Sequence, residues 1–222
     1  MLVNAAGLQA STLLPGFPTD SFLAFALAVP FIQGALFSTL NAGTDLARDI
    51  QTGFLNRLSL TPLHGSALLA GHLTGVVVLG VAQAVFYISV GLTAGAGFAA
   101  GPGGIPVLLA FAALVSLGFG ALGSFFALRS GSGETVQGLF PVFFVFLFIS
   151  SMNAPRDLMA VDWFRTLATL NPVSYLLEFV RSLIITGWDA RALTVGLAVA
   201  VAIAAVALAL ASRELPRRMT RT

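Results

Sequence analysis

Long apolar runs without charge, separated by short polar connections, dominate the pattern of this chain. Five such runs contain no Asp, Glu, Lys or Arg, and they cover residues 21–44, 67–93, 105–128, 135–152 and 192–212. A helix needs about 20 residues to cross the roughly 30 Å hydrocarbon core of a bilayer. The pattern therefore predicts an all-α membrane protein, a bundle with five visible transmembrane helices.

The connections between these runs are too short to hold a further folded domain. The second and third runs are joined by GAGFAAGPGGIP, in which Gly and Pro interrupt both helices, and the third and fourth are joined by RSGSGE. The longest connection, 153–191, carries mixed charges and no run of spanning length. We therefore expect a single transmembrane domain over residues 1–222.

Composition supports a membrane location and excludes several kinds of site. Hydrophobic residues make up 57% of the chain and charged residues 9%, more apolar surface than one soluble domain can bury. The absence of cysteine excludes disulfide bonds, thiol nucleophiles and cysteine-based metal sites. We expect no catalytic residue, no metal or cofactor site and no nucleic-acid partner in this chain.

The arginines predict the orientation, since the sequence contains no lysine. With the C-terminus inside, the inner loops and tail carry Arg48, Arg57, Arg129, Arg213, Arg217, Arg218 and Arg221, and the outer loops carry Arg156, Arg165, Arg181 and Arg191. This excess predicts a cytoplasmic C-terminus and an outer N-terminus. The first twenty residues lack the features of a signal peptide. We therefore expect another span before Met1, or a shortened form of a six-span architecture.

The segment from Asp45 to Leu63 has the period of an amphipathic helix. Apolar residues recur every four positions, at Leu46, Ile50, Phe54 and Leu58. Polar residues fall on the opposite arc, at Asp45, Asp49, Thr52 and Asn56. Pro62 lacks a backbone donor and would end the helix. Such a helix either lies on the membrane surface or presents its polar arc to a protein.

A second short helix is predicted in the long outer connection. Asn171 can cap it, Pro172 suits its first position, and Gly187 can end it. Its apolar stripe consists of Val173, Leu176, Leu177, Val180, Leu183 and Ile184. About fifteen residues cannot cross a bilayer, so we expect a re-entrant or surface helix. Glu178 and Arg181 could pair at i, i+3, either as an ordinary surface pair or with a gating role.

Two glycine motifs lie within the predicted spans. GFGALG, at 118–123, fits the dinucleotide-binding pattern G-x-G-x-x-G, but no strand precedes it and it lies inside an apolar run. GHLTG, at 71–75, fits G-x-x-x-G. We interpret both as sites of close helix packing. A Walker A loop needs a lysine, which this sequence lacks, so this chain is not expected to hydrolyse ATP.

Two segments resemble a known family. The run DIQTGFLNRLSLTPLHGSALLAGHL is similar to the first cytoplasmic loop of the ABC-2 type permeases, the membrane subunits of bacterial drug, antibiotic and polysaccharide exporters. The run from Pro141 to Trp188 resembles that family's ending, with an aromatic span, a Pro-containing loop and an N-P-x-x-Y helix followed by Arg. The resemblance covers roughly residues 22–212. The family usually has one more span before this region.

The resemblance implies roles for both short helices. In the family, the first cytoplasmic loop forms a coupling helix that docks onto an ATPase subunit, which binds ATP and Mg²⁺. The implied contact residues are Asp45, Arg48, Asp49, Thr52, Asn56 and Arg57. Short outer helices of the family dip into the outer leaflet, which implies a role in closing the exit for Asn171, Pro172, Tyr175, Glu178 and Arg181. A second permease copy or paralogue would complete a dimer.

The function implied is that of the permease subunit of an ATP-driven exporter in the bacterial cytoplasmic membrane. Its cargo would be an amphiphilic drug, a lipid or a glycan-like substrate. The alternative is an ion-coupled secondary transporter or channel, which usually keeps ionisable groups within its spans; here only His72 approaches that description. An intramembrane serine protease commonly has a G-x-S-x-G pentapeptide, and none occurs. The substrate and the choice between homodimer and heterodimer stay open.

Overall fold

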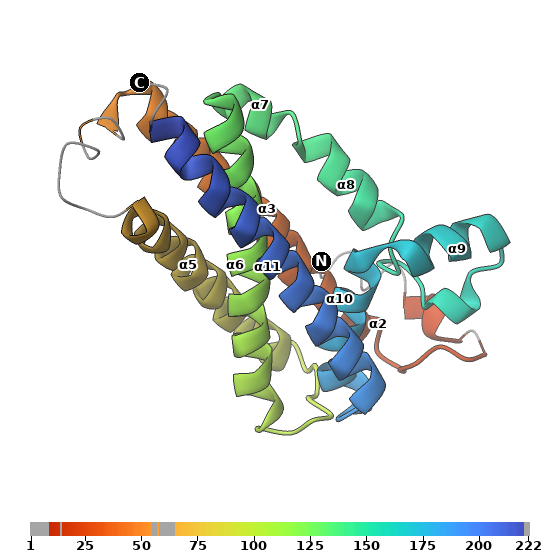
Figure 1. The fold of residues 1–222 in the computed structure, drawn as a ribbon. Coiled ribbons are helices and arrows are strands. Elements are labelled where there is room, and N and C mark those ends of the chain that lie inside the picture. The colour runs from red at the N-terminus through yellow and green to blue at the C-terminus, as the bar shows by residue number, and fades with distance from the viewer. Residues whose placement is uncertain (1–8, 14, 55–56, 58–64, 220–222) are drawn as a thin grey trace. The chain divides into compact units, whose positions relative to one another are not determined.

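The computed structural model describes residues 9–13, 15–54, 57 and 65–219. Regular structure in these residues is helical throughout (Figure 1). The elements, in chain order, are η1 (Gln9–Leu13), α2 (Phe22–Ala26), α3 (Ala28–Gln51), α5 (Gly65–Thr93), α6 (Gly104–Ser130), α7 (Gly133–Gln137), α8 (Phe140–Phe148), η2 (Arg156–Leu158), α9 (Asp162–Leu170), α10 (Pro172–Arg181), the π-helical turn η3 (Ser182–Thr186) and α11 (Ala190–Met219).

The chain forms two compact units. Unit 1 comprises residues 1–33, 82–111 and 144–199, and unit 2 comprises residues 34–81, 112–143 and 200–222. The chain passes from one unit to the other within α3, α5, α6, α8 and α11. Aromatic rings dominate one cluster of unit 1, where Phe22 and Phe25 are buried against Phe17. The core of unit 2 is mainly aliphatic and draws on α3, α5, α6, α7 and α11.

Four helices in the described residues are long and apolar enough to cross a membrane. They are Phe22–Gln51, which joins α2 and α3, then α5, α6 and Ala190–Arg218 of α11. The predicted spans 67–93 and 105–128 agree with α5 and α6 to within two residues at each end. The last helix continues beyond its predicted end at residue 212 to Met219. The chain is thus a multi-pass helical membrane protein.

The fourth predicted span, 135–152, is not a single helix. It forms α7 and α8, separated at Gly138 and Leu139. Helix from residue 133 to 148 would extend only about 24 Å at 1.5 Å per residue, which is less than the hydrocarbon thickness. Pro141 explains the break, because it has no N–H to donate to the carbonyl of Gln137. By length, the described residues contain four spanning helices rather than the five predicted.

The predicted amphipathic helix is not separate from the first span. Asp45, Arg48 and Asp49 belong to α3, which continues to Gln51, and Gly53 follows with a positive φ of 69°. The helix continues past residue 44 because Leu46 and Ala47 are buried in the core of unit 2. The sequence-based boundary at residue 44 was therefore wrong. Asn56, Leu58 and Pro62 lie outside the described residues.

The glycines of GFGALG pack against three different helices within unit 2. A Cβ at Gly118 would lie 3.1 Å from the backbone of Ala204 in α11, and one at Gly120 would lie 2.7 Å from Val76 in α5. A Cβ at Gly123 would collide with the backbone carbonyl of Thr39 in α3. The prediction that this motif serves helix packing is confirmed.

The second glycine motif differs from the first. No described atom outside its own helix lies within 4 Å of a Cβ built at Gly71 or Gly75, and both positions on α5 are exposed. A methyl group would therefore fit at either position. The close packing predicted for GHLTG is not found within the described part of the chain.

Candidate functional site

The end of α3 presents polar side chains to the surroundings of unit 2. Of the implied contact residues, Asp45, Arg48, Thr52 and Arg57 are exposed and Asp49 is partly exposed. No ion pair between described residues uses any of them. The hydroxyl of Thr52 donates to the backbone carbonyl of Asp49 at 3.4 Å. We call Asp45, Arg48, Asp49 and Thr52 the α3 end.

The apolar side of the same segment faces the interior of unit 2. Leu46 is 6% exposed, and Ile50 is partly buried against the same core. Phe54, which follows the end of α3, is 44% exposed. The predicted amphipathic pattern is therefore present through Ile50, and Leu58 lies outside the described residues.

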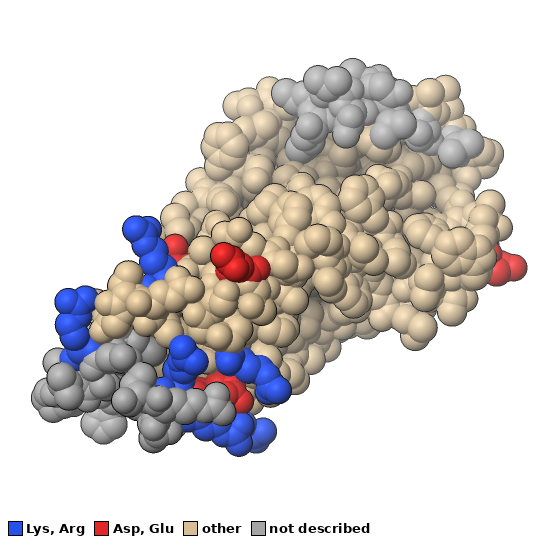
Figure 2. Space-filling view, turned by 90° about the horizontal axis from the view of Figure 1, so that it is seen from above, with Lys and Arg blue, Asp and Glu red and all other residues tan. Residues whose placement is uncertain are grey.

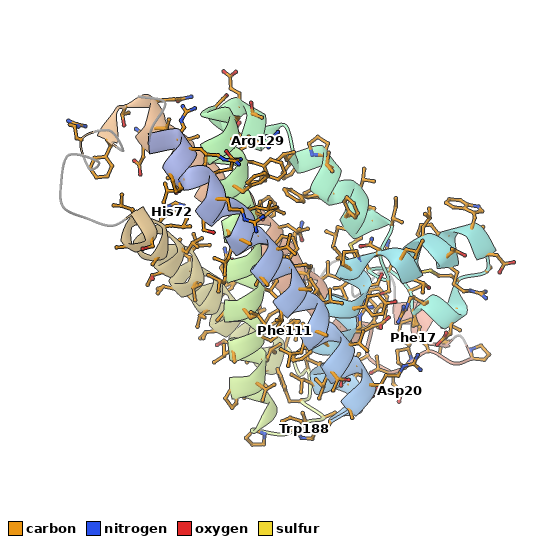
Figure 3. The ribbon with its side chains drawn as sticks, in the orientation of Figure 1. Phe17, Asp20, His72, Phe111, Arg129 and Trp188 are labelled. Atoms are coloured by element: carbon orange, nitrogen blue, oxygen red, sulfur yellow. The ribbon has the colours of Figure 1, made fainter. Side chains whose placement is uncertain are left out.

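A cavity of about 320 Å³ opens beside Asp49 in unit 2. Its lining combines Asp49 and His72 with apolar side chains that include Leu46, Phe54 and Leu215. Figure 3 labels His72 on α5. Its Nε2 lies 3.0 Å from the carbonyl oxygen of Ala42 in α3, and since a carbonyl only accepts, Nε2–H donates. His72 thus links two helices, which accounts for a polar side chain at this place.

The last turns of α3, α6 and α11 belong to unit 2, and each of these turns contains arginine. The arginines are Arg48, Arg129, Arg217 and Arg218. The amide of Gln51 donates to the carbonyl of Gly131 at 3.3 Å, and the guanidinium of Arg218 lies against the same glycine. Positive charge at a helix C-terminus complements the helix dipole. Figure 2 shows basic side chains gathered in one region of the face drawn, with acidic side chains beside them.

In unit 1, α10 begins and ends as the sequence predicts. The Oδ1 of Asn171 accepts from the backbone N–H of Val173 at 3.0 Å, and Pro172 is the first helical residue. The helix continues through η3 and stops at Gly187, whose φ of 95° suits glycine. Tyr175 donates its hydroxyl to the carbonyl of Thr169 in α9 at 2.7 Å, which ties the two consecutive helices together.

The ion pair of Glu178 is not the predicted one. Arg156, in η2, donates to the Glu178 carboxylate at 2.6 Å, and its guanidinium lies 4.6 Å from the centroid of the Tyr175 ring. Burial raises the pKa of Glu178 above its usual value, and the neighbouring Arg156 opposes that rise. The i, i+3 spacing to Arg181 permitted a pair, but a residue from a distant segment of the chain takes the place of Arg181.

Arg181 points into unit 1 and binds backbone carbonyls. Its Nε donates to Phe25 at 3.2 Å, Nη1 to Ser151 at 2.5 Å and Nη2 to Met152 at 2.7 Å. The guanidinium also lies 3.6 Å from the centroid of the Phe25 ring, in cation–π geometry. Burial lowers the pKa of Arg181 to about 9, so it stays protonated at neutral pH. No helical periodicity could reveal these partners, which lie 29 to 156 residues away.

Comparison with known proteins assigns the family. A model of the ABC-2 type transporter family matches residues 5–185. The chain is also similar to the daunorubicin resistance ABC transporter permease protein DrrB1 of Streptomyces coeruleorubidus, with 31% identity over 170 residues. That similarity covers 74% of this chain and 58% of the relative, so the chain spans little more than half the length of that protein. No solved structure gives a match. The family match covers most of the chain, which therefore belongs to the ABC-2 type transporter family.

Proposed function

We propose that this chain is the permease subunit of an ATP-driven exporter that moves an amphiphilic compound out of a bacterial cell. Family membership and the similarity to a drug-resistance permease support the general class. The observation that carries the proposal is the α3 end, where charged side chains of a spanning helix stand exposed and form no ion pair with described residues. Such side chains are available to a partner outside the membrane.

The partner we propose is an ABC ATPase subunit that binds ATP and Mg²⁺. Asp45, Arg48, Asp49 and Thr52 follow spacings of three and four residues, so they lie along one side of the end of α3. Arg57 is exposed shortly after it, and Asn56 completes the set of residues that we assign to the contact. Permease subunits of ABC transporters are typically not the ATPase, so hydrolysis belongs to this second chain.

The proposed topology places the α3 end and the C-terminus in the cytoplasm, following the arginine distribution. This topology requires a crossing between α6 and α11, and we propose that α7, α8 and the turns that follow α8 make it together. In this topology α10 is a short helix at the outer side. A single transmembrane domain and a dimer with a second permease chain are further parts of the proposal.

The cargo class follows from two considerations. The relative in Streptomyces coeruleorubidus is a daunorubicin resistance permease. The short helix α8 has the sequence FPVFFVFLF, and Val145, Phe146 and Phe148 on it are exposed. Ion-coupled transport gains no support from His72, because its ring is bound to the backbone of α3.

The test is transport in inverted membrane vesicles that contain the chain together with its ATPase subunit. We expect uptake of daunorubicin that requires ATP, is blocked by vanadate and persists when a protonophore collapses the proton gradient. A partner variant that binds ATP without hydrolysing it should show no uptake. Uptake that depends on the proton gradient and not on ATP would replace this proposal with secondary transport.

A further inference from the structure

The C-terminal end of α8 leaves backbone groups that its own helix cannot pair. The helix stops at Phe148, and residues 149–153 form turns and a bend. The last carbonyls of any helix lack intrahelical donors, and those that are buried cannot bind water instead. Partners for these groups must come from elsewhere in unit 1.

One face of α10 supplies these partners. The Nδ2 of Asn171 donates to the carbonyl of Phe146 at 2.5 Å, and the hydroxyl oxygen of Ser174 accepts from the N–H of Ser151 at 3.1 Å. Arg181 donates to the carbonyls of Ser151 and Met152. Positions 171, 174 and 181 fall within an arc of about 80° on one side of a helix, since successive residues are about 100° apart.

These contacts are shielded from solvent. Asn171 is 5% exposed, Arg181 8%, and Ser151 and Ser174 are fully buried. A buried carbonyl that loses its donor keeps the full penalty of desolvation, so release of this segment from α10 is disfavoured. Arg181 also holds the carbonyl of Phe25 in α2, so one guanidinium joins three segments that are far apart in sequence.

We infer that Asn171, Ser174 and Arg181 are positioning residues that fix the C-terminal end of α8 and residues 149–152 to α10, so that these parts move as one body when the transporter works. Asn171 has two separable tasks in this arrangement. Its Oδ1 caps α10, and its Nδ2 holds α8. This inference goes beyond the proposed function, because it depends on neither the cargo nor the ATPase.

The first test uses the absence of native cysteine. Ser150→Cys places a single thiol at a position that is 2% exposed, within the segment that α10 holds. Asn171→Ser keeps a good capping residue but is too short to reach Phe146, and Arg181→Lys keeps the charge but loses the planar set of donors. In membranes, each variant should raise the rate of maleimide labelling of this thiol about tenfold over the Ser150→Cys parent.

A matched control changes an exposed polar side chain of unit 1 whose hydrogen bond lies within α9. Thr166→Ala removes a hydroxyl that donates to the carbonyl of Asp162 within α9, and it should leave the labelling rate unchanged. Labelling in Asn171→Ser and Arg181→Lys within about twofold of the parent would overturn the inference. So would an equal rise in the Thr166→Ala control.

The second test addresses common movement. The backbone N–H of Ser151 donates to the hydroxyl of Ser174 at 3.1 Å, so the two residues are neighbours, and a disulfide between Ser151→Cys and Ser174→Cys, once verified by gel mobility, joins the segment to α10. If both move as one body, the oxidised protein keeps ATP-driven transport at the rate of the same protein after reduction. Transport that stops on oxidation and returns on reduction would show that the two separate during the cycle, and the inference would be wrong. Because the reduced protein supplies the reference rate, a failure of the proposed function itself is recognised as absent transport in both states.

Discussion

Two polar segments of this chain use their charges in opposite ways. On α10, in unit 1, Arg181 is buried and donates to three carbonyls, and Glu178 pairs with Arg156. At the α3 end, in unit 2, Asp45 and Arg48 are exposed and form no ion pair with described residues. Similar charged residues on short polar stretches thus serve the fold in one place and face outward in the other.

The difference indicates where each charge has its energetic effect. Only the groups that surround a buried guanidinium can offset its desolvation cost. Removing the guanidinium should therefore lower the stability of the folded chain. An exposed charge contributes little to stability, so its effect must come from a second molecule if it has one. The comparison therefore separates a stability role for α10 from a binding role for the α3 end.

The largest effect is expected from Arg181. Arg181→Ala leaves the carbonyls of Phe25, Ser151 and Met152 without this donor, and should lower the free energy of unfolding by about 3–5 kcal/mol. Arg48→Ala should change it by less than about 0.5 kcal/mol. Denaturant unfolding in detergent, followed by fluorescence of Trp163 and Trp188, measures both. Equal losses in the two variants would remove the distinction between the segments.

Two glycines of the spanning helices allow a similar comparison between a buried and an exposed position. Gly123→Ala forces a methyl group against the backbone of Thr39 and should cost about 1–3 kcal/mol of unfolding free energy. Gly75→Ala meets open space and should be neutral or stabilise the helix by up to about 1 kcal/mol. The same unfolding assay applies. A destabilising effect of Gly75→Ala that appears only in the assembled transporter would indicate that another helix packs against this face.

A smaller effect is expected from a charge reversal at the α3 end. Asp49→Arg should weaken association with the ATPase subunit about tenfold, because it reverses a charge within the proposed contact. Asp162→Arg, an exposed charge reversal on α9 in unit 1, should leave association unchanged. Affinity measurements on purified subunits in detergent compare the two. Asn56→Arg should also weaken association with the ATPase subunit.

The smallest effect concerns the pair of Arg156 and Glu178. Their side chains are 21% and 27% exposed, so a double-mutant cycle with alanine should give a coupling of about 0.5–1 kcal/mol in unfolding free energy. The cycle between Glu178 and Arg181 should give less. A stronger coupling for the second cycle would restore the i, i+3 pair that the sequence predicted.

The sequence pattern predicted those helices and helix ends that depend on residues close together in the chain. The apolar runs gave α5 and α6 nearly to the residue, and Asn171, Pro172 and Gly187 gave the start and end of the α10 and η3 segment. Each of these features depends on groups within one helix or at its termini. The break between α7 and α8 was missed although Pro141 signals it, because an apolar run without charge suggested one continuous span.

Features that depend on distant contacts could not be predicted in the same way. The continuation of α3 past residue 44 follows from the burial of Leu46 and Ala47 among other helices. The sequence offered Arg181 as the partner of Glu178 because it is near along the helix, but only the fold brings Arg156 to that carboxylate. The outward-facing residues of the α3 end were named from a family resemblance, and their role still needs a partner to test it.

The most direct test of the account is site-specific cross-linking from the α3 end to the ATPase subunit. Single substitutions Asp45→Cys and Asp49→Cys, in a chain without native cysteine, can be treated with a short bifunctional reagent in membranes that contain both subunits. The account predicts cross-linked permease–ATPase product from both variants and none from Asp162→Cys, an exposed position on α9. Absence of product from the two α3 variants, or equal product from Asp162→Cys, would contradict the assignment of the α3 end as the surface that binds the ATPase.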